Sequence, residues 1–211
     1  MHRIVAGRTG EKSPDWEVTA VGTRVVVEVK ELQANPNDIR FAEDVRKNQV
    51  GSYGDNPGRR VSLHILDAAK QLRPYQTEDT PCVIVLFDNV VVDGSKVHPD
   101  GFSLWPEQID FGMYGFEDVK LRIPSDGKSV RYFGNGRAGA SRLKSNAKEY
   151  VSAVSVLYEM PNEGRLILAT YHNYFARIPL PETVFAGEDD VHLRKPCHPA
   201  NSPGAWVRFN A

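Results

Sequence analysis

The chain has 211 residues, of which 41% are hydrophobic and 25% are charged, which is enough for one well-packed core and too short to require two. Its formal net charge of -1 gives no overall attraction to nucleic acid, so a polyanion would have to bind a local basic patch. Two cysteines, Cys82 and Cys197, do not make a disulfide framework, and no apolar run has the length of a membrane span or signal peptide. We therefore expect a cytoplasmic protein without membrane association.

The first predicted element is a hairpin within residues 13–32. Segments 16–20 and 24–30 are rich in Val and Thr, as strands are, and Gly22 can supply the positive φ that a tight turn needs. We predict a two-residue loop at Gly22 and Thr23.

This loop sets which charged side chains share a face of the hairpin. Counting outwards from it, Asp15 faces Lys30 and Glu17 faces Glu28. Opposed residues, and alternate residues along one strand, project to the same side, so Asp15, Glu28 and Lys30 share a face; a three-residue loop would send Asp15 to the other face. Two carboxylates and an ammonium group suit a Mg²⁺ site, in which the lysine orients a water or neutralises negative charge.

The pattern of Pro14-Asp15, a gap, and Glu28-Val29-Lys30 at the end of an apolar strand resembles the PD-(D/E)XK nuclease superfamily. The resemblance implies a restriction-endonuclease-like fold and hydrolysis of phosphodiester bonds, with DNA as the expected substrate. It also implies Mg²⁺ as the cofactor, with Mn²⁺ as an alternative, and metal ligation by Asp15 and Glu28, while Lys30 assists the attacking water. The alternative is an ordinary half-exposed hairpin whose charges pair with one another.

One feature of that family has no counterpart here. Its members usually carry a helix before the first strand, often with an acidic residue that completes the metal site, and residues 1–12 are too few and too polar for one. Either Glu11 replaces that residue, or the site is incomplete, or the chain is part of a longer protein.

Residues 33–58 are rich in Asn, Pro, Asp and Gly and are predicted to be a surface insertion with a short helix at 39–47. It is either a solvated loop or a segment that lies over the substrate.

The clearest predicted helix covers residues 59–73, because its apolar residues fall on one stripe and Pro74 ends it. One flank of the stripe carries polar residues at i, i+4, i+7 and i+11, namely Arg60, His64, Asp67 and Gln71. The resemblance implies a helix after the Glu-x-Lys strand with a Lys or Gln near the site, which makes Gln71 a second candidate catalytic residue. A solvated helix edge is the alternative, and for His64 it is the preferred one.

Residues 82–87 form a continuous apolar run, typical of a strand buried on both faces. A helix that crosses over to a strand parallel to the Glu-x-Lys strand completes the minimal nuclease-like core. Asp88, at the end of this strand, is expected to begin a turn.

The rest of the chain is predicted to extend the sheet. We expect a strand at 90–92, an irregular or short helical connection at 109–115, a hairpin of 119–123 with 129–133, and an antiparallel pair of 150–158 with 165–176. His172 interrupts the last strand and is predicted to be structural.

The most basic segment, residues 128–148, contains six cations, several glycines and no acidic residue. A flexible cationic loop suits contacts to phosphate, although a solvated loop is equally compatible with this composition. The segment lacks the Gly-Lys-Ser/Thr end of a P-loop. The predicted nucleic-acid contacts are Arg131, Arg137, Arg142 and Lys144.

In the Pro-rich end of the chain, His192, Cys197 and His198 lack the paired spacing of a zinc site. Together these patterns predict an α/β domain over residues 1–185, with the core motif in 13–88, and a C-terminal tail over 186–211. The domain has a mixed central sheet, flanking helices and a restriction-endonuclease-like core with an antiparallel strand extension. The predicted function is metal-dependent hydrolysis of nucleic acid; the alternative is a catalytically inactive module of the same fold that binds nucleic acid or a protein partner.

Overall fold

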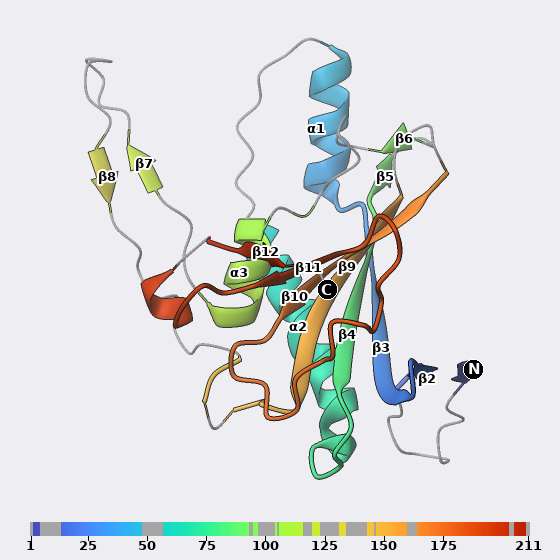
Figure 1. The fold of residues 1–211 in the computed structure, drawn as a ribbon. Coiled ribbons are helices and arrows are strands. Elements are labelled where there is room, and N and C mark those ends of the chain that lie inside the picture. The colour runs from blue at the N-terminus through green and yellow to red at the C-terminus, as the bar shows by residue number, and fades with distance from the viewer. Residues whose placement is uncertain are drawn as a thin grey trace.

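The computed structural model describes residues 2–4, 14–47, 57–92, 95–96, 104, 106–115, 120–122, 131–133, 143–145, 147–159, 164–202 and 205–209. Their centre is an eight-stranded sheet in the order β1-β2-β3-β4-β9-β10-β11-β12 (Figure 1). These strands are β1 (His2–Ile4), β2 (Trp16–Ala20), β3 (Thr23–Gln33), β4 (Cys82–Asn89), β9 (Val151–Glu159), β10 (Leu166–His172), β11 (Val191–Arg194) and β12 (Val207–Phe209).

The sheet is mixed. Strands β3, β4 and β9 are parallel, β2 and β10 flank them in antiparallel orientation, and β11 lies parallel to β10. The predicted α/β class with a parallel centre and an antiparallel extension is therefore confirmed. The predicted pairing of 150–158 with 165–176 corresponds to the antiparallel β9–β10 pair.

Two small sheets and the helices complete the described elements. The sheets are β5 (Val91–Val92) with β6 (Ser95–Lys96), and β7 (Lys120–Arg122) with β8 (Arg131–Phe133), which is the hairpin predicted for 119–133. The helices are α1 (Pro36–Arg46), α2 (Pro57–Leu72), α3 (Pro106–Tyr114) and two short 3-10 turns, η1 (Arg73–Tyr75) and η2 (Pro199–Asn201). In the described part of the chain, no helix combines the length and the hydropathy of a membrane span.

Hydrophobic side chains cover both faces of the central strands. On one face Val26, Ile84 and Leu86 belong to the same core cluster as Ile65 and other residues of α2. The alternate residues of β3 and β4 pack on the opposite face against Leu180 and Val184, in the connection between β10 and β11. The structure confirms that β4 is buried on both faces and that it follows α2 as a strand parallel to β3.

The packing of α2 against α3 depends on a glycine. A Cβ atom at Gly112 of α3 would lie 2.5 Å from Val61 Cγ1 and 3.0 Å from Ile65 Cδ1, and both side chains are buried. A well-packed core resists an added methyl group because its neighbours must leave their preferred positions.

We expect Gly112→Ala to lower the free energy of unfolding by about 1–3 kcal/mol, measured by urea denaturation. Adding Val61→Ala to this variant makes room for the methyl group. The loss in the double variant should therefore be smaller than the sum of the two single losses; an additive result would contradict the predicted clash.

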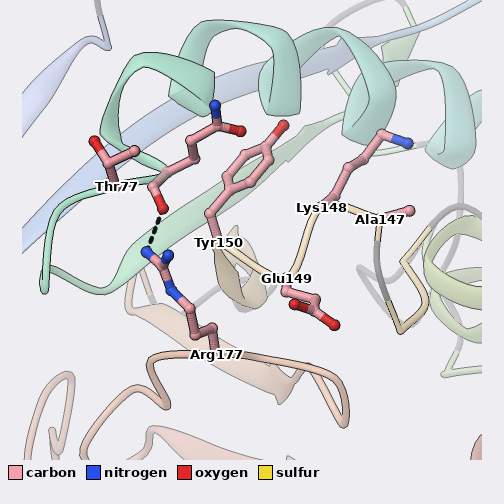
Figure 2. Close-up of a pocket in the computed structure, with 7 residues that line it drawn as sticks. Thr77, Ala147, Lys148, Glu149, Tyr150 and Arg177 are labelled. Atoms are coloured by element: carbon pink, nitrogen blue, oxygen red, sulfur yellow. Dashed lines mark hydrogen bonds between the residues drawn. The ribbon is translucent and has the colours of Figure 1, made fainter.

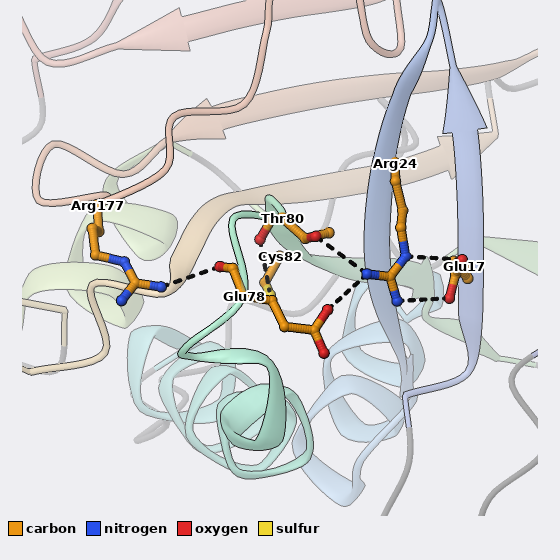
Figure 3. Close-up of polar contacts among 6 residues, drawn as sticks. All are labelled: Glu17, Arg24, Glu78, Thr80, Cys82 and Arg177. Carbon is orange, nitrogen blue, oxygen red and sulfur yellow. Dashed lines mark hydrogen bonds and ion pairs between the residues drawn. The ribbon is translucent and has the colours of Figure 1, made fainter.

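An arginine fastens the end of the β2–β3 hairpin to the loop before β4 (Figure 3). Arg24 donates to both carboxylate oxygens of Glu17, at 2.9 and 3.0 Å, and to Glu78 Oε2 at 2.7 Å. It also donates to Thr80 Oγ1 at 3.3 Å. Hydrogen bonds and ion pairs with the two glutamates raise the pKa of Arg24 above its ordinary value. The clamp fixes the hairpin relative to the start of β4.

The C-terminal region predicted as a tail packs onto the main sheet. Strand β11 pairs in parallel with β10, and β12 pairs with β11. Trp206, next to β12, stacks edge-on against Tyr171 of β10 at 4.9 Å between ring centroids. Residues 191–194 and 207–209 are thus structural parts of the sheet.

Candidate active site

The β2–β3 hairpin turns at Val21 and Gly22, so the predicted loop at Gly22 and Thr23 is wrong by one residue. Val21 and Gly22 have positive φ, 49° and 77°, as both central residues of a type I′ turn require. Thr23 is already in β3, where it pairs with Ala20.

This correction moves every cross-strand pair by two residues. Glu17 pairs with Val26 rather than with Glu28, and Trp16 pairs with Val27. Continuing this register places Asp15 opposite Glu28 rather than opposite Lys30. A shift of two residues keeps each side chain on its face, whereas a shift of one would reverse it.

Glu28 is the buried centre of the predicted site. It lies on the α2 side of β3 and is only 1% exposed. Its Oε1 accepts hydrogen bonds from Lys30 Nζ, at 2.8 Å, and from Gln71 Nε2. Its Oε2 is buried and has no hydrogen-bond partner among the residues that the structure describes, an arrangement that costs free energy unless another ligand is supplied.

Burial and charge both act on the pKa of Glu28. Burial raises the pKa, the hydrogen bond from Lys30 lowers it, and the negative charge of Asp15 raises it further. The net result is a pKa above the ordinary value. A cation beside Glu28 would favour the charged form of this carboxyl group and so offset the cost of its burial.

Lys30 lies between two carboxylates. Its Nζ is 2.8 Å from Glu28 Oε1 and 3.2 Å from Asp67 Oδ2. Burial lowers the pKa of Lys30, but its hydrogen bonds and ion pairs with Glu28 and Asp67 outweigh burial and raise the pKa above the ordinary value. Lys30 is therefore an ammonium group at neutral pH.

Asp15 is exposed and lies at the rim of the site, just before β2. Its Oδ2 accepts a hydrogen bond of 2.8 Å from the backbone N–H of Val29. That bond holds the carboxylate beside the strand that carries Glu28 and Lys30. The structure thus brings together the three residues that the sequence selected.

The polar flank of α2 faces β3 along its length. Gln71 contacts Glu28, Asp67 contacts Lys30, and Arg60 donates to the backbone oxygen of Gln33. The order of these contacts shows that α2 and β3 run in opposite directions. The prediction that Gln71 approaches the Glu-x-Lys strand is confirmed.

His64 is half-buried on the same flank. Burial lowers its pKa, and the positive charges of Arg60 and Lys30 lower it further. His64 is therefore a neutral imidazole at neutral pH.

Asp67 is the site residue that sequence reasoning left without a role. It occupies the i+7 position of the polar flank, between His64 and Gln71. That position was the available signal, but an aspartate on a solvated helix edge has the same spacing as one that contacts a strand.

The predicted nucleic-acid contacts are only partly described. Arg131 is the first residue of β8, whereas Arg137 and Arg142 lie outside the described residues. Lys144 is exposed, and its backbone forms an isolated β-bridge with Ala147. Contact with nucleic acid stays a prediction.

The end of the basic segment borders a cavity of about 390 Å³. Figure 2 shows Lys148, the last residue of this segment, and the following Glu149 beside the ring of Tyr150, with Arg177 below it. Arg177 donates to the backbone oxygens of Gln76 and Glu78. The cavity is lined by charges of both signs, so it is not a purely cationic surface.

Two other candidate residues, Asp88 and His172, contact parts of the sheet and lie outside the candidate site. Asp88 does not begin a turn: it is buried within β4, opposite Leu32. His172 Nε2 lies 2.8 Å from His192 Nδ1, which agrees with its predicted structural role.

Within the described ranges, no three His, Cys, Asp or Glu side chains form a group that could hold a metal ion. The two acids predicted to bind metal are Asp15 and Glu28, and Glu11, the proposed replacement for a third acid, lies outside those ranges. Comparisons with protein-family models, with curated proteins and with solved structures found no match to this chain.

Proposed function

We propose that this chain is a PD-(D/E)XK-type nuclease that hydrolyses phosphodiester bonds of nucleic acid, with DNA as the expected substrate and Mg²⁺, or alternatively Mn²⁺, as the cofactor. The observation that carries the proposal is that Asp15 and Lys30 both lie beside the buried carboxylate of Glu28. The order β2, β3, α2, β4, with α1 inserted between β3 and α2 and with β4 parallel to β3, also supports a restriction-endonuclease-like core.

The chemistry of the residues fits a hard cation. Mg²⁺ prefers carboxylate oxygens, and Glu28 Oε2 is a buried oxygen without a hydrogen-bond partner among the described residues. Glu28 and Asp15 would hold the ion, which when bound supplies a Lewis acid that acidifies water and offsets phosphate charge.

The protein's own groups have distinct roles in this proposal. Lys30, as an ammonium group, donates hydrogen bonds to the attacking water and stabilises the negative charge that develops on the phosphate. The ion pairs that raise its pKa above the ordinary value favour this role as a donor. Gln71 donates to Glu28 Oε1 and so fixes the orientation of the carboxylate. Its role is to position a metal ligand.

The second candidate function is an inactive module of the same fold that binds nucleic acid or a protein partner. It is favoured by two observations: the described residues contain no group of three side chains that could hold a metal ion, and Lys30 pairs with both Glu28 and Asp67. Cleavage in the presence of Mg²⁺ or Mn²⁺ separates the two candidates.

Metal binding can be tested without a substrate. We expect Mg²⁺ at ten times its dissociation constant to stabilise the wild type by about 1.4 kcal/mol, a rise in Tm of about 3–6 °C for a chain of this size. Glu28→Gln keeps the shape of the side chain but removes its charge, and should abolish the rise.

Glu31→Gln is the matched control. Glu31 is also on β3, but it is exposed and its carboxylate accepts hydrogen bonds from Asn89 and Gln33. This variant should retain the full Mg²⁺-dependent rise in Tm. If Mg²⁺ raises the Tm of the wild type and of Glu28→Gln equally, Glu28 does not bind the metal and the proposed site is refuted.

A further inference from the structure

We propose that Asp67 is a positioning residue that holds the Lys30 ammonium group in the site, a role that rests on the proposed nuclease function. The two groups come from different elements, β3 and α2, and meet at 3.2 Å between Lys30 Nζ and Asp67 Oδ2.

In the proposed function, Glu28 interacts with two cationic groups. Its carboxylate already accepts from Lys30 at 2.8 Å, and in the proposed function it also ligates a divalent cation. A divalent cation and the Lys30 ammonium group repel each other when both bind the same carboxylate. An oxygen that ligates the cation is also a weaker hydrogen-bond acceptor for the ammonium group. Lys30 therefore needs a second, independent carboxylate.

Asp67 meets that need because it is anchored separately from Glu28. It lies on α2, which is fixed to the core by Val61, Ile65 and Leu72, all fully buried. A site residue is held best by a partner on a rigid element. Asp67 is thus fixed in place independently of Glu28.

Ordering the side chain of Lys30 costs more conformational entropy than ordering that of Asp67. A lysine side chain has about 2 kcal/mol of rotamer entropy, and Lys30 is only 19% exposed, whereas Asp67 is 46% exposed. Asp67 can therefore remain hydrated while it restrains a largely buried ammonium group. The other oxygen of Asp67 lies 3.9 Å from Lys70 Nζ, which adds a second cation to the same carboxylate.

The test compares Asp67→Asn with Glu43→Gln. Glu43 is a matched control because it is 52% exposed, lies on α1 and pairs with a lysine, Lys47, at 3.7 Å. Both substitutions remove one helical carboxylate and its ion pair. Carbon-13 relaxation of the Lys30 Cε, recorded without metal, should show an ordered side chain in the wild type and in Glu43→Gln, and a mobile one in Asp67→Asn.

Kinetics provide the second readout. Asp67→Asn should lower kcat about tenfold with KM changed less than twofold, because a misplaced group costs rate more than binding. Glu43→Gln should leave kcat unchanged. In a Lys30→Ala background, Asp67→Asn should cause no further loss, because the group that it positions is gone.

Two results would overturn the role of Asp67: a Lys30 side chain that stays ordered in Asp67→Asn, or a loss of kcat that persists in the Lys30→Ala background. The failure of the nuclease proposal would look different. A wild-type protein that cleaves nothing with Mg²⁺ or Mn²⁺, while Lys30 loses order only in Asp67→Asn, would uphold the contact and reject the catalytic function.

Discussion

Lys30→Ala is expected to reduce the rate of Mg²⁺-dependent DNA cleavage by about 10²–10³-fold, the loss typical of removing one donor that stabilises charge in a transition state. Lys30 is held at 2.8 Å from Glu28, on the face that Asp15 also approaches. Its ammonium charge is opposite in sign to the charge that develops on the phosphate. Alanine removes this charge and leaves water in its place, which stabilises the transition state less well.

The substitution should affect catalysis more than binding. Most nucleic-acid affinity comes from phosphate contacts spread over a surface, and Lys30 is only 19% exposed. We therefore expect a Lys30→Ala variant to bind a DNA duplex, measured by fluorescence anisotropy in EDTA, within about threefold of the wild type, since a single phosphate contact is the most it could lose.

The measurement is cleavage of plasmid and of single-stranded DNA with Mg²⁺, with Mn²⁺ and with EDTA. Lys47→Ala is the control, because Lys47 is a 59% exposed lysine directly after α1 and its replacement should leave the rate unchanged. Undiminished cleavage by Lys30→Ala would reject its assigned role. DNA binding by a wild-type protein that cuts none of these substrates would favour the inactive module.

The sequence predicted the faces of the hairpin better than its register. The alternation of charge and valine in β3 determines that Glu28 and Lys30 share a side, whichever turn is used. The turn itself was misplaced because Gly22 fits either position of a two-residue loop, and Val21 is a poor candidate for positive φ. The error was two residues in register, so Asp15, Glu28 and Lys30 still lie together although the predicted loop is wrong.

Long-range pairing explains what the sequence did not predict. The polar flank of α2 was visible as a repeat, but only the packing of α2 on β3 shows that Asp67 reaches Lys30. Strand β11 has four residues and pairs with β10 across a connection of eighteen residues, 173–190. Such a short strand has too few residues for its alternation to identify a partner. For this reason the sequence predicts a tail over residues 186–211.

The β10–β11 pair also brings two histidines together. His172 Nε2 is 2.8 Å from His192 Nδ1, and His192 Nε2 is 3.3 Å from the backbone oxygen of Phe185. Because that oxygen can only accept, His192 donates from Nε2 and accepts at Nδ1 from His172. Burial, and then electrostatic interactions with His192 and Arg194, lower the pKa of His172 to about 4.

This lowered pKa predicts acid sensitivity of the fold. In the unfolded chain a histidine binds its proton near pH 6.5, whereas folded His172 binds it near pH 4. Between these values the unfolded state holds the extra proton, so the free energy of unfolding decreases as the pH falls. By pH 4 the loss due to this group should approach about 3 kcal/mol.

We expect His172→Gln to remove this part of the acid sensitivity, because the glutamine amide does not titrate in this range and can still donate to His192 Nδ1. Urea denaturation at intervals between pH 7.5 and pH 4 should show that the variant gains stability relative to the wild type as the pH falls. His198→Gln, which removes an exposed histidine, should follow the wild type. If the difference in stability between His172→Gln and the wild type is the same at every pH, then His172 is not protonated differently in the folded and unfolded states, and the acid sensitivity of the fold must come from other groups.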